Sequence, residues 1–105
     1  MAGKFYVVSW GSGWSDEKDT VSTHCGVHGL YGDRASAERG LEECRDEFID
    51  EIVNNPDFDE EDREAATQDL EVYGSVKEDY FEIDYTSWDK RNEIYIHLEE
   101  KEIKD

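Results

Sequence analysis

Residues 79–99, DYFEIDYTSWDKRNEIYIHLE, contain two runs in which apolar and polar side chains alternate. Such alternation is typical of strands that have one face on a hydrophobic core and the other in water. The runs are Asp79 to Thr86 and Glu93 to Glu99, and the residues between them read as a turn. We therefore expect an antiparallel hairpin whose buried face carries Phe81, Ile83, Tyr85, Ile94, Ile96 and Leu98.

A second pair of strands is predicted near the N-terminus. Lys4 to Trp10, KFYVVSW, is rich in β-branched and aromatic residues, and the glycines of residues 11–13 (GSG) are expected to end it. Thr20 to Tyr31 is a weaker strand, and its two glycines, Gly26 and Gly29, suggest a bulge or a close approach of another backbone. These two strands are expected to pair as an antiparallel hairpin with a long loop.

Two helices are predicted between the hairpins. Apolar side chains spaced by three or four residues form one face of an amphipathic helix that ends near Val53, before the sequence NNP at residues 54–56. A second helix begins near Phe58 and ends at Gly74, which suits a left-handed C-terminal cap. The apolar face of the first helix comprises Ala37, Leu41, Cys44, Phe48 and Ile52.

The order of these elements, β-β-α-α-β-β, lacks the alternation of strand and helix that builds a parallel sheet. We therefore predict an α+β fold with residues 1–105 in one domain. Its four-stranded antiparallel sheet would have both helices packed on one face. The other face would be solvated and would carry polar and aromatic side chains, among them Tyr80, Glu82, Asp84, Tyr95 and His97.

The composition is strongly acidic. The 105 residues include 29 acids and 11 bases, for a net charge of −18. This balance excludes an ordinary nucleic-acid-binding protein and argues against docking on an anionic membrane. No apolar run approaches the ~20 residues of a membrane-spanning helix, and the apolar stretch near the N-terminus is too short for a signal peptide. We expect a cytoplasmic protein that contacts neither nucleic acid nor membrane.

The negative charge is concentrated in residues 42–71, which hold 14 acids and two bases. On the first helix, Glu43, Asp46, Glu47 and Asp50 have the spacing of a single stripe on the solvent side. Trp88, in the turn of the last hairpin, is a candidate apolar anchor. The predicted partner-binding residues are Glu43, Asp46, Glu47, Asp50, Glu51, Asp57, Asp59, Glu60, Glu61, Asp62, Glu64 and Trp88.

Two interpretations of this charge remain open: a solvated face that maintains solubility, or a surface for a strongly basic partner. In composition, size and charge the chain resembles the small acidic inhibitors that phages and mobile elements make against restriction or CRISPR enzymes. That resemblance implies a non-enzymatic DNA mimic in the host-cell cytoplasm, which would block the nucleic-acid groove of a basic protein or complex. The alternative is a non-catalytic adaptor that binds a protein partner through the open sheet face.

No motif for catalysis or metal binding stands out. The chain has neither the G-x-S-x-G nor the P-loop lysine motif, and the acids after Asp57 lack the glycine and glutamate of a calcium loop. Two histidines and two cysteines could supply the four ligands that tetrahedral zinc requires. Neighbouring residues of a strand point to opposite faces, however, so these side chains are not expected to converge without a bulge. We therefore predict no metal and no cofactor. Whether Cys25 and Cys44 pair or bind metal, and how many chains associate, stays open. The four residues considered for zinc are His24, Cys25, His28 and Cys44.

Overall fold

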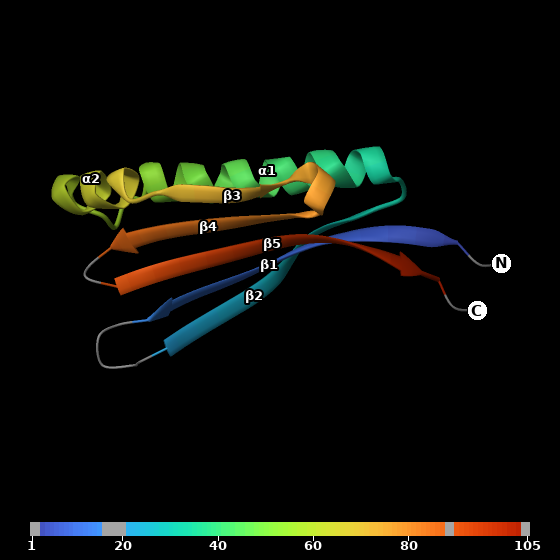
Figure 1. The fold of residues 1–105 in the computed structure, drawn as a ribbon, viewed down its shortest axis with the longest axis horizontal. Helices are drawn as coiled ribbons and strands as arrows, with labels where there is room; N and C mark the ends of the chain where they lie inside the picture. The colour runs from blue at the N-terminus through green and yellow to red at the C-terminus, as the bar shows by residue number, and fades with distance from the viewer. Residues whose placement is uncertain (1–2, 16–20, 88–89, 104–105) are drawn as a thin grey trace.

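Five antiparallel strands form one sheet in the computed structural model, which describes residues 3–15, 21–87 and 90–103. Two helices cover one face of this sheet (Figure 1). The α+β class, the antiparallel sheet and the two helices are as predicted. In chain order the elements are β1 (Lys4–Ser15), β2 (Val21–Tyr31), α1 (Arg34–Val53), α2 (Glu60–Gln68), β3 (Glu71–Ser75), the 3₁₀ turn η1 (Val76–Glu78), β4 (Tyr80–Ser87) and β5 (Lys90–Glu102).

The strands are arranged in the order β2-β1-β5-β4-β3. Both predicted hairpins are present, and β1 joins them by pairing with β5 from Lys4↔Glu102 to Ser15↔Arg91. The first and last strands of the chain therefore lie side by side in the middle of the sheet, while β2 and β3 are its edges (Figure 1).

The prediction of four strands is wrong, because residues 71–75 form a fifth strand and not the end of a helix. Helix α2 ends at Gln68, and β3 pairs with β4 from Glu71↔Asp84 to Ser75↔Tyr80. This pairing satisfies the backbone groups on the outer edge of β4, which a continued helix would leave open. Gly74 does adopt the expected left-handed conformation, with φ of 91°, but within this strand.

The predicted end of the first strand at residues 11–13 is also wrong, because β1 continues to Ser15. Gly11 and Gly13 stay in register with both neighbours, opposite Cys25 and Thr23 on β2 and opposite Tyr95 and Glu93 on β5. Pairing on both sides holds the glycines extended despite their weak intrinsic preference for strands.

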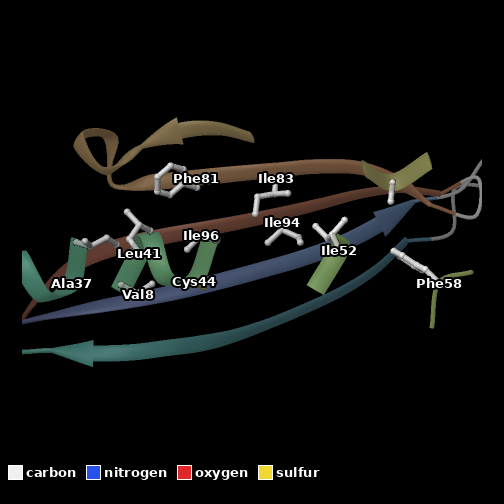
Figure 2. Close-up of a cluster of buried hydrophobic side chains, with 12 residues drawn as sticks. Val8, Ala37, Leu41, Cys44, Ile52, Phe58, Phe81, Ile83, Ile94 and Ile96 are labelled. Atoms are coloured by element: carbon white, nitrogen blue, oxygen red, sulfur yellow. The ribbon is translucent and has the colours of Figure 1, made fainter. Parts of the chain in front are cut away.

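The hydrophobic core lies between the helices and the sheet. The apolar face predicted for α1 is confirmed, since Ala37, Leu41, Cys44 and Ile52 are buried and Phe48 is half-buried. These residues pack in one cluster with side chains from the sheet and with Ala66 of α2. Figure 2 shows Ala37, Leu41, Cys44 and Ile52 among the core side chains of the strands. The buried sheet residues are Val8, Phe81, Ile83, Ile94, Ile96 and Leu98.

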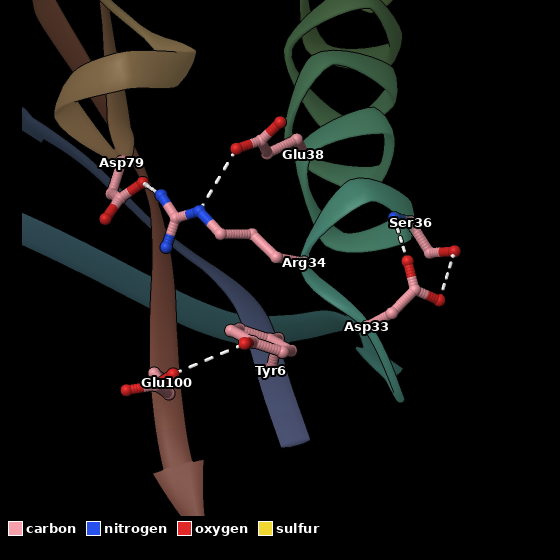
Figure 3. Close-up of polar contacts among 7 residues, drawn as sticks. All are labelled: Tyr6, Asp33, Arg34, Ser36, Glu38, Asp79 and Glu100. Carbon is pink, nitrogen blue, oxygen red and sulfur yellow. Dashed lines mark hydrogen bonds and ion pairs between the residues drawn. The ribbon is translucent and has the colours of Figure 1, made fainter. Parts of the chain in front are cut away.

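Polar contacts at the N-terminal end of α1 fix where this helix begins. The Asp33 carboxylate accepts a hydrogen bond of 2.8 Å from the backbone N–H of Ser36, which is the usual N-cap arrangement (Figure 3). The guanidinium of Arg34, one residue later, donates to Glu38 on the same helix and to Asp79 just before β4. These contacts tie the start of α1 to the sheet and so set which side of the helix faces solvent.

Candidate functional site

The predicted acidic stripe lies on the solvent side of α1. Because Leu41, Cys44 and Ile52 face the sheet, the carboxylates between them are turned outward. All six are exposed, and from Glu42 to Glu51 they extend over about 14 Å along the helix axis. The exposed acids of α1 in this stripe are Glu42, Glu43, Asp46, Glu47, Asp50 and Glu51.

The acidic surface continues through the turn after α1 and onto α2. Asp57, Asp59, Glu60, Glu61 and Glu64 are exposed, and Asp62 is half-buried. Asp59 also has a structural role, since its carboxylate accepts a 2.7 Å hydrogen bond from the backbone N–H of Asp62 and caps α2. We call the exposed surface of residues 42–64 the acidic helix layer. It brings together every predicted partner-binding residue except Trp88, which lies outside the described residues.

The two basic residues of this segment are turned toward the body of the protein. Arg45 places its guanidinium 4.7 Å from the ring centre of Phe81, and its Nε lies 2.9 Å from Asp46. Arg63 donates a partly buried hydrogen bond of 3.2 Å to the backbone carbonyl of Asn55. Both side chains are only partly exposed, and Arg45 pairs with one carboxylate of the stripe, that of Asp46.

Tyrosine and cysteine side chains beneath the layer remain protonated. Burial raises the pKa of Cys44 to about 11, and the charges of Glu47 and Glu43 raise it further. Burial is also the largest cause of the raised pKa of Tyr31, and the charge of Glu43 is the second. The pKa of Tyr85 is raised by burial first and by the charge of Glu51 second. The negative field of the layer therefore reaches inward, and these groups add no charge of their own near neutral pH.

The four residues considered for zinc do not come together. Cys25 and Cys44 are free thiols, one exposed and the other buried. His24 is exposed, whereas the side chain of His28 is 14% exposed and lies beside α1. A register shift in the β1–β2 pairing around His28 turns its ring toward Glu43 and Glu47, at 3.8 and 3.5 Å. The sequence suggested the bulge through its glycines but not this contact.

The other face of the sheet is open and differs in chemistry. Tyr95 stacks on His97, with ring centres 6.5 Å apart, and its hydroxyl donates a 3.1 Å hydrogen bond to Glu93. Burial, followed by the hydrogen bonds to Glu93 and Glu82, raises the pKa of Tyr95 to about 12. Nearby, a groove of about 380 Å³ runs over Gly11 and Gly13, where the strand lacks side chains.

Apolar side chains at the β2 edge extend this open face. Val27 is 62% exposed and Leu30 is 68% exposed, which makes them the most exposed large apolar residues among those described. Val27 lies opposite Ser9, and Leu30 lies opposite Val7. The molecule thus presents two distinct surfaces, the acidic helix layer on one side and a partly aromatic, partly apolar sheet face on the other.

Across the described part of the chain, no helix combines the length and apolar character needed to cross a membrane. No protein-family model, curated protein or solved structure matches the sequence or the fold.

Proposed function

We propose that this protein is a non-enzymatic inhibitor that uses the acidic helix layer to occupy the nucleic-acid groove of a basic partner. The observation that carries the proposal is the exposure of eleven carboxylates over α1, the turn and α2, while the two arginines of the segment are only partly exposed and contact Phe81 and the Asn55 backbone. A basic groove that binds phosphates would meet a surface whose negative charge resembles that of a phosphate backbone, presented by a rigid scaffold.

The spacing of the carboxylates supports mimicry of a phosphate backbone. Side chains four residues apart on a helix lie about 6 Å apart along its axis. Phosphates on one DNA strand follow each other with an axial rise of ~3.4 Å, and the turn of the strand lengthens the direct distance. Lysine and arginine side chains arranged for phosphates could therefore pair with the stripe on α1.

The charge exceeds what solubility needs. A net charge of about 2–8 is enough for a small domain, whereas this chain carries −18. Each pair of like charges four residues apart on a helix destabilises the helix by roughly 0.2–0.5 kcal/mol. Concentrating them on one surface therefore weakens the helix, and a binding role explains why they are concentrated there.

We infer that the partner belongs to a nuclease or defence complex, of the kind that phage-encoded anti-restriction or anti-CRISPR inhibitors block. Such complexes hold nucleic acid in positively charged channels. The inhibitor would act in the cytoplasm of the host cell, where these complexes work. It would bind the protein and not the nucleic acid, because its own surface repels phosphates.

Paired charge reversals test the proposal. Wild type, Asp46→Lys/Asp50→Lys and Glu99→Lys/Glu102→Lys would each be immobilised and exposed to a nuclease-treated bacterial lysate at about 100 mM salt. The two variants change the net charge equally, but only the first alters the acidic helix layer. We expect nucleic-acid-binding proteins on the wild-type and Glu99/Glu102 columns and their loss from the Asp46/Asp50 column. Equal retention on all three columns would contradict the proposal.

The exposed Val27 and Leu30, together with the groove beside Tyr95, favour a second candidate function. In this case the protein would be an adaptor that binds a protein partner through the open sheet face. Because that contact is largely apolar, it would survive high salt and the Asp46/Asp50 reversal. It would be lost in Leu30→Ser/Tyr95→Ser, which leaves the acidic helix layer unchanged.

A further inference from the structure

His28, Glu43 and Glu47 form a cluster that joins the edge strand β2 to helix α1. The imidazole Nε2 lies 3.8 Å from a Glu43 oxygen, and Nδ1 lies 3.5 Å from a Glu47 oxygen. One ligand atom from each of the three side chains can be chosen so that all lie within 4.8 Å of one another. Two elements far apart in the sequence thus bring an imidazole and two carboxylates together, with each carboxylate against a different ring nitrogen.

We propose that this cluster binds a single divalent transition-metal ion of the zinc class. Zinc is bound by histidine nitrogen and carboxylate oxygen at about 2.0–2.2 Å. The two glutamates are exposed at 65% and 62%, so their side chains have room to rotate until both carboxylates face the same ring nitrogen around one ion. Water would complete the coordination, as in zinc sites with three protein ligands.

The imidazole distinguishes this cluster from the other acids of the layer. The side chain of His28 is 14% exposed and is held in place by the bulge in β2, so one ligand is already positioned against the helix. A nitrogen ligand favours zinc, cobalt or nickel over magnesium and calcium, which prefer oxygen alone. Two carboxylates would also balance the charge of a divalent ion, and so remove the repulsion between Glu43 and Glu47.

Zinc titration of the untagged, metal-free chain by calorimetry tests the site. His28→Ala and Glu43→Gln/Glu47→Gln each remove ligands. The matched controls are His24→Ala, an exposed histidine of the same strand, and Asp46→Asn/Asp50→Asn, which changes the charge of the same helix equally. We expect one zinc ion per chain in wild type and both controls. Affinity should fall at least about tenfold in the ligand variants, since even residues behind the ligands contribute that much.

A second readout does not depend on the variants folding. In the wild-type protein, added zinc should shift the imidazole NMR signals of His28 and leave those of His24 and His97 in place. Equal binding by His28→Ala and wild type, or equal shifts of all three histidines, would overturn the site and leave only diffuse attraction to acids. The site shares Glu43 and Glu47 with the acidic helix layer, but Asp46 and Asp50 are not ligands. The Asp46/Asp50 reversal therefore tests the inhibitor proposal with the metal ligands in place, and zinc binding is measured without any partner.

Discussion

Replacing Asp46 and Asp50 by lysine should make the folded protein more stable at low salt, although it alters the surface that we propose binds the partner. Asp46 lies one helical turn from Glu42 and Glu43, and Asp50 lies one turn from Glu47. The double variant turns these three repulsive pairs into attractive ones. The two replaced positions repel each other before and after the change, so that pair contributes nothing.

The expected gain follows from the pairs. Each pair changes from a cost of roughly 0.2–0.5 kcal/mol to a similar gain, so three pairs together contribute about 1–3 kcal/mol. Against this stand the exposed contacts of Asp46 with Arg45 and of Asp50 with Asn54, which are worth about 0.2–1 kcal/mol each. The net gain is about 1 kcal/mol, which corresponds to a rise in Tm of about 5 °C for a domain of this size.

Thermal unfolding followed by circular dichroism measures this difference. It should be largest near 20 mM salt and shrink at about 1 M, where the Debye length is only about 3 Å. Glu99→Lys/Glu102→Lys is the control. It should give no gain, because it removes the 2.8 Å ion pair of Glu99 with Lys101 and places a lysine opposite Lys4. A double Asp46/Asp50 variant less stable than wild type at low salt would refute the reasoning, because the acids would then support the fold.

Three further predictions concern the core, one glycine of β3 and one tyrosine. Leu41→Ala, at a fully buried position, should lower the free energy of unfolding by about 2–5 kcal/mol in urea titrations; a loss below that range would mean that α1 packs loosely on the sheet. Gly74→Ala should also destabilise the protein in urea, because φ is 91° there and an added Cβ would lie 2.4 Å from the Tyr80 carbonyl oxygen. The pKa of Tyr95 is raised to about 12, so the neutral hydroxyl stabilises the fold at pH values below the ordinary tyrosine pKa of about 10, and this contribution is lost as the pH rises toward 12. In an ultraviolet titration, Tyr95→Phe should therefore remove absorbance change near pH 12, and a loss confined to pH 10 would contradict the contact with Glu93.

The hairpin of β4 and β5 and the buried face of α1 could be predicted because a single periodicity determines each of them. Alternation in residues 79–99 assigns Ile83 and Ile96 to the core, and a spacing of three and four assigns Leu41 and Cys44. The same periodicity places the carboxylates of α1 on the solvent side. The acidic stripe was therefore predicted together with the helix.

Edge pairing and register could not be predicted in this way. Residues 71–75 become a strand because β4 offers an unpaired edge, and local sequence carries no signal of that edge. The contact of His28 with Glu43 and Glu47 depends on a one-residue shift in the β1–β2 pairing. Such a shift moves a side chain from one face of the sheet to the other, so alternation alone could not assign His28 to the helix side.

Displacement by duplex DNA tests the central claim most directly. Proteins captured on the immobilised wild-type chain at about 100 mM salt would be washed first with duplex DNA and then with about 500 mM salt. If the acidic helix layer occupies a phosphate-binding groove, the captured proteins leave with the DNA, because DNA and the layer compete for the same cations. If they stay bound through both washes, binding is mainly apolar, and the open sheet face, not the acidic helix layer, holds the partner.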